Sequence, residues 1–541
     1  MKPMLKSRIS TAVAAGLMGL AAVAAQAQTA PAGLSDANVG QALIYPYYTV
    51  NAGWITTFNL INTSEKTVAV KVRFHELKNS RDVLDFNIIM SPYDSWTGWV
   101  EDSDKGTRLR TVDKSCTSPL VVDGANASAI AYTGEFNDTG GSGLNRLREG
   151  YVEVLVMGVA TATAQTAKPP SGFDANAAFT AGDSLYVPYF SEHVNGVPRN
   201  CANVDKAFIA QSDKWQAPNL PTATIYDETL KCTGTGPSSA LPGSGYPLAS
   251  CDFEAPVAGT DNPLKGNVGW LNAATGYGAG SEAIAVEDWA RGAYVTAQQF
   301  PWFLEPTFAT GTALWTIDPS AYEATVDAFA TMNEWADNPD NGARTDWVVT
   351  FPTKAFHVDL FNNQIQAASS KYRNNGAIVI TCTDPTDRTT CTPTDTPIPV
   401  APFEQYFGET KAADGTGISP ITVQWNLFDR EEGTVVFESD GTVISPAPPP
   451  EIRIDSLNYE ANVVQFAASG APLGSNFPAQ LDASAALGGA TSGWALLSFT
   501  GTDALKSGLP ARAFAVRTID RTNDGQAYDA GYLLTAPPTT P

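Results

Sequence analysis

The sequence VAVKVRFH, residues 68–75, alternates apolar and small or polar side chains. Val70 and Phe74 point to one side of such a segment, whereas Lys71, Arg73 and His75 point to the other. Successive side chains of a β-strand face opposite sides of a sheet. The pattern therefore predicts a half-buried strand, with one apolar face and one face open to solvent.

Similar patterns surround this segment and predict strands at Ile44–Val50, Thr57–Ile61, Val83–Met90 and Ser95–Val100. Short polar turns such as Asn62-Thr63-Ser64 separate them, which favours an antiparallel sandwich. Further strands are expected at Tyr151–Val156, Leu185–Val187, Trp347–Phe351, Ala377–Cys382, Ile421–Phe428, Val435–Glu438, Ile452–Ile454, Val463–Phe466, Trp494–Phe499 and Phe514–Ile519. The sequence thus predicts a mainly β protein with antiparallel β-sandwich lobes and a disulfide-bearing insertion that contains a short helix.

Composition and pattern divide the chain into consecutive parts. We expect a signal peptide in residues 1–27, an N-terminal β-sandwich lobe in 28–200, a Cys-bearing insertion of loops and helix in 201–345, a C-terminal β-sandwich lobe in 346–535 and a tail in 536–541. The sequence leaves open whether the early and late strands form two sandwiches or one.

The helix of the insertion is expected to begin near Asp318. Asp is a good N-cap residue, and Pro319 suits the first helical turn. Tyr322, Val326 and Phe329 then recur at the spacing of one helical face.

The N-terminus has the features of a secretory signal peptide. Lys2, Lys6 and Arg8 precede an apolar run from Ile9 to Ala25, and Ala25-Gln26-Ala27 supplies a small-x-small cleavage pattern. A retained N-terminal anchor is the alternative, because the run approaches the length of a membrane span. No second apolar stretch of this length follows, so we expect an exported chain without a transmembrane helix after cleavage.

The chain is strongly acidic, with a formal net charge of −23. Without the three basic residues of the signal, 30 Lys and Arg (33 − 3) face 56 Asp and Glu, a net charge of −26 (30 − 56). Electrostatic repulsion argues against nucleic acid and anionic membrane surfaces as partners. Cations such as Ca²⁺ are suitable partners, and plain solubility is the alternative explanation of the charge.

All six cysteines follow the signal, and an even number in an exported chain predicts three disulfides. The short spacing of Cys382 and Cys391 favours that pair. Cys232–Cys251 is a second pairing, and Cys116–Cys201 is what remains of fifteen connectivities.

Catalytic motifs are not apparent. His75-Glu76-Leu77-Lys78-Asn79 begins like a zincin motif, but Asn79 stands where the second His is required. A G-x-S-x-G elbow is missing, although a Ser-His-Asp triad from distant residues stays open because geometry defines triads. We expect His75, His193 and His357 to be ordinary surface or strand-end residues, and the protein to be a non-enzymatic one.

Two groups of aromatic residues suggest an alternative. Aromatic side chains stack on sugar rings, which would favour a carbohydrate-binding or carbohydrate-active protein, but they also dominate sandwich cores. We favour the core interpretation for these residues, which are Tyr45, Tyr47, Tyr48, Tyr93, Trp96 and Trp99.

One loop has the ligand spacing of a Ca²⁺ site. In the sequence DRTNDG, residues 520–525, Asp520, Thr522 and Asp524 place oxygen atoms at positions 1, 3 and 5, with Gly525 at position 6. Gly531 stands where an EF-hand needs Glu, and Asp-Gly also forms plain turns. A Ca²⁺-stabilised periplasmic protein is therefore one alternative, and no other cofactor is expected.

The early strands also carry a family resemblance. Tyr45–Val50, Asn62-Thr63-Ser64, Val70–Phe74, Leu84–Ile88 and Ser91–Val100 resemble exported or cell-surface, β-rich proteins of Gram-negative bacteria. The resemblance covers mainly residues 44–100, with a weaker likeness at Trp347–Lys354, and implies no activity and no site.

Together these observations predict a non-enzymatic structural or adhesion protein. Its expected location is the extracellular space, the outer-membrane surface or the periplasm of a Gram-negative bacterium. The expected partners are cell-surface or matrix polymers, or other copies of the chain, because sheet edges add strands from neighbours.

Overall fold

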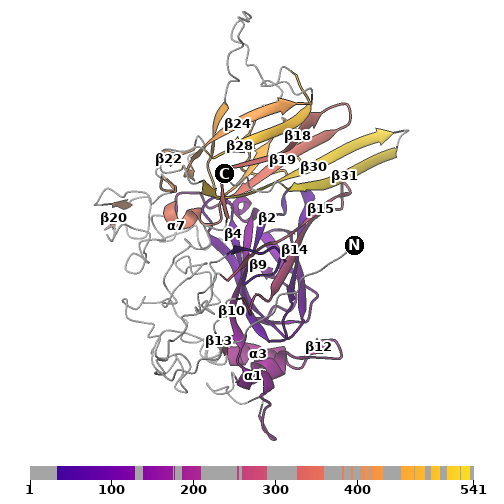
Figure 1. Cartoon of the computed structure of the whole chain (residues 1–541), viewed down its shortest axis with the longest axis vertical. Coiled ribbons are helices and arrows are strands. Elements are labelled where there is room, and N and C mark those ends of the chain that lie inside the picture. The colour runs from indigo at the N-terminus through magenta and orange to yellow at the C-terminus, as the bar shows by residue number, and fades with distance from the viewer. Residues whose placement is uncertain are drawn as a thin grey trace, which may run out of the picture.

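The structure is a computed structural model. It describes residues 33–127, 138–174, 176, 185–208, 253–254, 259–288, 326–358, 380–382, 391–393, 402–403, 405–408, 410–412, 416–430, 453–467, 470–481, 489–499, 508–523 and 526–535. Within these ranges the protein is mainly β, with antiparallel sheets and few helices, which confirms the predicted fold class (Figure 1). No helix of the described ranges is long and apolar enough to cross a membrane.

The first sandwich packs two antiparallel sheets against each other (Figure 1). One has the strand order β1-β16-β2-β10-β4-β5-β8, with β13 also paired to β10, and the other has the order β15-β14-β3-β6-β7-β9. The strands are β1 (Gly33–Leu34), β2 (Ala42–Thr49), β3 (Ile55–Asn62), β4 (Val68–Glu76), β5 (Asp82–Met90), β6 (Ser95–Ser103), β7 (Gly106–Arg110), β8 (Cys116–Ser118), β9 (Ala125–Asn126), β10 (Glu149–Ala160), β13 (Phe253–Glu254), β14 (Leu264–Asn272), β15 (Tyr277–Glu282) and β16 (Ile284–Glu287).

Four of these strands, β13 to β16, lie in the segment that we expected to be an insertion. β14 pairs with β3, and β16 pairs with β2, so this segment completes both sheets of the first sandwich. The alternation of apolar residues did not predict β14, because Gly266 occupies an inward position where an apolar side chain is expected. A Cβ on Gly266 would collide with the Tyr45 hydroxyl, so the close packing of the sheets requires glycine there.

The second sandwich is one long sheet folded over on itself. Its strand order is β25-β24-β28-β18-β19-β26-β27, and β30 joins β19 to β31. β18 pairs with β28 over most of its length but meets β19 only at its last two residues, so the sheet bends there into two layers. The strands are β18 (Ala330–Asn338), β19 (Ala343–Thr350), β24 (Ile421–Asp429), β25 (Arg453–Leu457), β26 (Ala461–Gln465), β27 (Ala479–Gln480), β28 (Ser492–Ser498), β30 (Arg512–Asn523) and β31 (Gln526–Thr535).

Aromatic rings fill the space between these two layers. Trp347 and Trp425 lie 5.3 Å apart between ring centroids, and Phe466 packs against both of them. Trp335 stacks on Phe466 from the opposite layer. Rings of this size bury enough apolar surface to hold the layers together.

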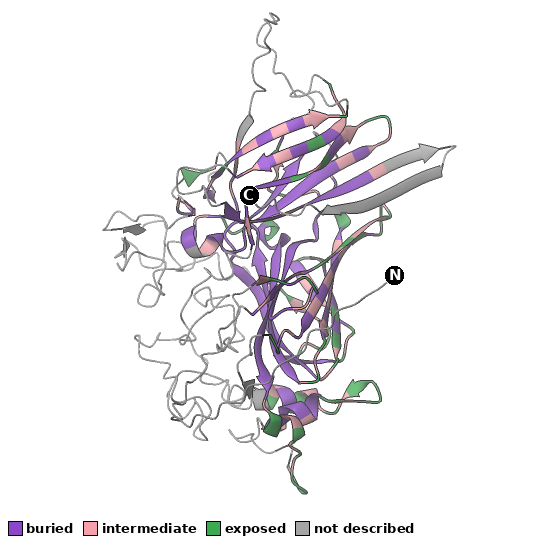
Figure 2. Cartoon of the chain, viewed as in Figure 1, coloured by how far each residue is buried: buried purple, intermediate pink, exposed green. Residues whose placement is uncertain are grey.

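The two sandwiches share part of one core. Val348 and Phe514, which face away from the aromatic interior, belong to the hydrophobic cluster of the first sandwich. The rings of Trp270 and Phe514 stack with centroids 5.2 Å apart across this junction. The strands therefore form two sandwiches joined by a buried interface, as Figure 2 shows in the continuous buried region between them.

Three short helices cover the end of the first sandwich that lies far from the second (Figure 1). They are α1 (Ala162–Thr166), α2 (Val187–Ser191) and α3 (Cys201–Phe208). The predicted strand at Leu185–Val187 is therefore wrong, because α2 begins at Val187 and buries Phe190 against this end. Cys116 of β8 is bonded to Cys201 at the start of α3, with 4.9 Å between the Cα atoms, which confirms that predicted disulfide.

The other two predicted disulfides are less fully described. β20 (Ile380–Cys382) pairs with β21 (Cys391–Pro393) so that Cys382 lies directly opposite Cys391 in the backbone. This register suits the predicted pairing, whereas Cys232 and Cys251 lie outside the described residues. The remaining short elements are β11 (His193–Val194) with β12 (Val197–Pro198), β17 (Asp327–Ala328) with β29 (Leu509–Pro510), β22 (Thr410–Lys411) with β23 (Gly417–Ile418), the helix α7 (Lys354–Val358) and the 3-10 helices Asn51–Gly53 and Leu144–Leu147.

Most of the predicted helix near Asp318 lies outside the described residues, and its expected C-terminal part contains the strand β17. The predicted strand at Val435–Glu438 lies entirely outside the described residues.

Candidate functional site

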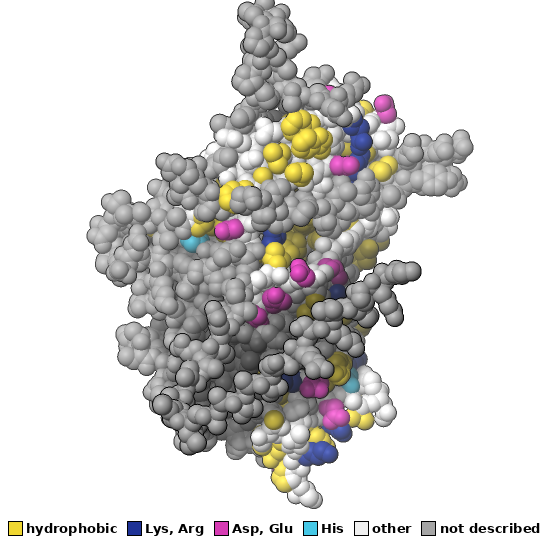
Figure 3. All heavy atoms as spheres, in the orientation of Figure 1, with side chains coloured by type: hydrophobic (Ala, Val, Ile, Leu, Met, Phe, Trp, Pro, Cys, Tyr) yellow, Lys and Arg dark blue, Asp and Glu magenta, His cyan; other side chains and the backbone are white. Residues whose placement is uncertain are grey.

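Apolar side chains gather on the outer face of the second sandwich. Phe428 of β24 lies opposite Trp494 of β28, and Leu496 of β28 lies opposite Met332 of β18. Trp494 is 39% exposed and Met332 is 44% exposed, whereas Phe428 and Leu496 are half-buried. The rings of Phe428 and Trp494 stack with centroids 4.0 Å apart and planes 9° apart. We call these four residues the outer aromatic patch, and Figure 3 shows hydrophobic side chains exposed over this sheet.

Polar side chains border the outer aromatic patch. Gln424 and Asn426 occupy the outward positions of β24 that precede Phe428. On β18, Glu334 accepts a hydrogen bond from Arg517 at 2.8 Å, and Arg430 lies 3.9 Å from the same carboxylate. The site therefore offers a flat aromatic surface, neutral amides and a compensated charge group, which is the chemistry of binding and not of proton transfer.

The outward residues of two strands carry a sequence signal for this site, although we did not predict the site from it. In β24 the inward positions Val423, Trp425 and Leu427 are already apolar, so the outward position of Phe428 would ordinarily be polar. β28 shows the same excess, with Trp494 outside. When a sheet has one face open to solvent, large apolar residues on that open face as well as on the buried face indicate an interaction surface.

The aromatic residues that we considered as a sugar platform belong mainly to the core. Trp96 is 3% exposed and packs on Phe86 inside the first sandwich, while the indole of Trp99 donates to Glu101. Tyr93 is exposed, at 70%, but stands alone at a turn. The core interpretation is confirmed for Tyr45, Tyr47, Tyr48 and Trp96, each of which is buried.

The predicted solvent face of β4 is wrong, because both faces of this strand are buried. Lys71 lies 3.2 Å from Asp85 of the neighbouring strand β5, and Arg73 lies 3.5 Å from Asp82. All four side chains are at most 3% exposed. Burying charge is costly unless opposite charges are paired, so this face is a structural core of ion pairs.

His75 lies next to the end of β4, as the strand-end alternative predicts, but it belongs to this buried face, so the expectation of a surface position is wrong. Its Nε2 lies 3.1 Å from the Glu153 carboxylate, its Nδ1 lies 2.8 Å from the Ser80 carbonyl, and its ring stacks on Tyr151. Burial by itself lowers the pKa of His75, but the Glu153 carboxylate outweighs burial, and the pKa is raised. His357 is also buried, at 3% exposure.

A second buried ion network fastens the turn between β4 and β5. The Glu76 carboxylate accepts hydrogen bonds from the Lys78 and Asn79 backbone amides and from Arg146. Arg146 also donates to Asp138, at 2.7 Å through Nη1. Burial alone would raise the pKa of Asp138, but the charge of Arg146 lowers it far below its usual value. Glu76 and Asp138 bond to residues of the turn between β4 and β5, so we assign this network a structural role.

Ser91, His193 and Asp94 lie close together, but they lack the geometry of a catalytic triad. Ser91 Oγ lies 3.2 Å from His193 Nδ1, and the Asp94 carboxylate lies 3.8 Å from Nε2. Asp94 instead accepts hydrogen bonds from the Ser91 and Ser95 backbone amides and from Ser115. It therefore shapes the turn, and the carboxylate is too far from the ring to orient a catalytic base.

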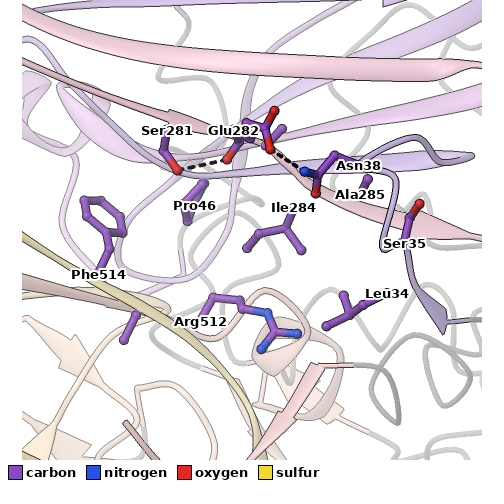
Figure 4. A pocket seen from close by; sticks show the side chains of 12 residues that line it. Leu34, Ser35, Asn38, Pro46, Ser281, Glu282, Ile284, Ala285, Arg512 and Phe514 are labelled. Carbon is purple, nitrogen blue, oxygen red and sulfur yellow. Dashed lines mark hydrogen bonds between the residues drawn. The ribbon is translucent and has the colours of Figure 1, made fainter. Parts of the chain in front are cut away.

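A pocket of about 280 Å³ lies at the junction of the sandwiches (Figure 4). Its walls are mainly apolar and include Pro46 and Ile284, with Arg512 of β30 directed into it (Figure 4). At the rim, Asn38 donates a hydrogen bond to Glu282. The Ser281 hydroxyl in its wall donates to the backbone carbonyl of Glu282 at 3.0 Å, so this serine is not hydrogen-bonded to a basic side chain that could activate it.

The predicted Ca²⁺ loop lies at the end of a hairpin. Asp520 and Thr522 lie within β30, and β30 remains paired to β31 up to Asn523 and Gln526. Asp524 lies outside the described residues. An Asp-Gly pair between two strands is the sequence of a tight hairpin turn, and the Ca²⁺ site stays a prediction.

The chain matches no known protein family, no curated protein and no solved structure. Its function must therefore be inferred from the geometry of its own residues.

Proposed function

We propose that this protein is an exported, non-enzymatic adhesion protein that holds cell-surface or matrix polymers through the outer aromatic patch. The observation that carries the proposal is the stacked pair Phe428 and Trp494 on the open face of the second sandwich. Water solvates such surface poorly, and contiguous apolar groups with a polar border mark interaction sites on soluble proteins.

Two further features support the proposal. The signal-like residues 1–27 and the disulfide Cys116–Cys201 suit an oxidising compartment outside the cytoplasm. The shared core of the two sandwiches, with Trp270 stacked on Phe514, provides a rigid support for a binding face. Rigid elements hold a binding surface with less loss of entropy than loops do.

Sedimentation with intact Gram-negative cells and with their extracted matrix tests the proposal on the oxidised full chain. We expect the wild-type protein to sediment and the double variant Phe428→Ala/Trp494→Ala to remain in solution. Tyr93→Ala is the matched control, because it removes an exposed aromatic ring from the first sandwich. Failure of the wild-type protein to sediment, or unchanged sedimentation of the double variant, would refute the proposal.

A further inference from the structure

We infer that the outer aromatic patch binds a neutral polysaccharide, whose pyranose rings pack on Trp494 and whose hydroxyl groups bond to the amides of Gln424 and Asn426. This inference rests on the proposed function and adds the chemical class of the polymer.

The layout of the patch suits an extended ligand. The register forms rows across the strands: Asn426, Leu496 and Met332 in one row, and Phe428, Trp494 and Glu334 in the next. Rows two residues apart along a strand are separated by roughly 7 Å, and neighbouring strands by about 4.8 Å. The surface is therefore an open grid over three strands, which fits a polymer lying across it better than a small molecule in a cavity.

The aromatic and amide groups match the two sides of a sugar ring. A pyranose presents C–H bonds on its faces, which pack on an aromatic ring, and hydroxyl groups around its edge. An amide side chain both donates and accepts hydrogen bonds, as a hydroxyl does. In the described part of the chain, no hydrogen bond engages the side chains of Gln424 or Asn426, and both are half-buried and outward-facing.

The charges favour a neutral polymer over an anionic one. Glu334 is compensated by Arg517 at 2.8 Å and by Arg430 at 3.9 Å, so the border of the patch carries no concentrated charge of one sign. The chain as a whole has a net charge of −23 and repels anionic polymers. A neutral ligand avoids both this repulsion and the cost of desolvating a charge.

The patch is too small for a stable interface with a second copy. Such interfaces typically use about 20–30 residues from each partner. The patch has four apolar residues, and two of them are half-buried. A polymer gains affinity by repeated contacts along its length and needs no such area.

Affinity electrophoresis of the oxidised full chain tests the inference. The gels contain one soluble polysaccharide each: a β-glucan, an α-glucan, a xylan, a mannan or a galactan as neutral probes, and alginate as the anionic probe. We expect at least one neutral polymer to retard the protein. Because a stacked ring contributes roughly 0.5–1.5 kcal/mol, Trp494→Ala should weaken binding to this polymer by roughly two- to tenfold. Asn426→Ala should weaken it by less, and Tyr93→Ala should not change it.

The remaining outcomes overturn the inference. These are retardation by no neutral probe, retardation by alginate alone, equal retardation of wild type and Trp494→Ala, or sedimentation equilibrium that shows a dimer which Trp494→Ala dissolves. Circular dichroism of each variant establishes that it is folded. If the double variant loses cell binding while no neutral probe binds the wild-type protein, the proposed function stands and only this inference fails.

Discussion

The two sandwiches differ in how they use the second face of a sheet. In the first sandwich, the face of β4 that carries Lys71 and Arg73 is buried, and its charges are paired with carboxylates of β5. In the second sandwich, the outer face of β24 and β28 is open, and it carries the stacked rings of Phe428 and Trp494. Polar residues are enclosed in one case, and apolar residues are exposed in the other.

This difference separates stability from recognition. Buried ion pairs contribute little net stability but become very costly when one partner is removed. Exposed rings contribute little to stability, and their removal affects mainly what the surface binds. Substitutions in the buried ion pairs should therefore destabilise the fold, whereas substitutions in the outer aromatic patch should mainly weaken binding.

The largest effect is expected for Arg146→Ala. The substitution leaves the buried carboxylates of Glu76 and Asp138 without their main partner, which should lower the free energy of unfolding by about 3–5 kcal/mol. Urea titration followed by tryptophan fluorescence measures the loss. Arg148→Ala is the control, because Arg148 pairs with Asp102 at a half-exposed site. Equal losses for both variants would contradict the structural role of the network.

The comparison also shows what the sequence could and could not predict. The period of two located β4, β5, β24 and β28 within a residue or two, because alternation reflects the strand geometry itself. The same period cannot show whether a polar face meets solvent. For Lys71 and Arg73 the answer depends on packing that joins distant parts of the chain.

The site was missed for a related reason. The apolar residues Trp425 and Leu427 define the inner face of β24, and Phe428, at the end of the predicted strand, falls on the outer face, where the alternation alone assigns it no neighbour. Its partner Trp494 is 66 residues away (494 − 428), and only the register of β24 with β28 brings the rings together. A sequence can show an excess of outward apolar residues, but pairing across strands needs the fold.

The next largest effect is a dependence of the free energy of unfolding on pH, which arises at the junction of the two sandwiches. Asp346 of β19 is fully buried and accepts a hydrogen bond from the Leu473 amide at 2.7 Å, and Glu149 of β10 accepts one from the Asn476 amide at 2.8 Å. The loop that contains Leu473 and Asn476 is thus hydrogen-bonded by one carboxylate from each sandwich. Burial, helped by the charge of Glu149, raises the pKa of Asp346 to about 7.

A raised pKa means that the folded state binds the proton more tightly than the unfolded state. The resulting stability is therefore complete below about pH 4 and is lost as the pH rises to about 7. We expect unfolding at pH 5 to require a few kcal/mol more than at pH 8. Asp346→Asn should flatten this slope, and urea titrations at both pH values measure it. An unchanged slope in Asp346→Asn would contradict the assignment.

A smaller effect on stability is expected for Trp494→Ala. It removes an exposed ring and its stacking on Phe428, which should cost about 1 kcal/mol. Trp425→Ala, on the inner face of the same sheet, removes a ring that is 2% exposed and should cost about 3–5 kcal/mol. Thermal melts of the two variants measure the difference. If the outer ring cost as much as the inner one, the patch would be part of the core.

The smallest effect is expected for Glu334→Gln, which removes the charge that Arg517 and Arg430 share beside the patch. The Glu334 side chain is 49% exposed, and pairs at such sites contribute at most about 1 kcal/mol because solvent screens them. The variant should melt within a few degrees of the wild-type protein. It removes one negative charge beside Arg517 and Arg430, so the border of the patch becomes more positive. We therefore expect Glu334→Gln to be retarded more strongly than the wild-type protein in gels that contain alginate, with the effect lost at high salt, because added salt screens exposed charges. Unchanged migration in alginate would mean that this charge group does not take part in selecting the polymer.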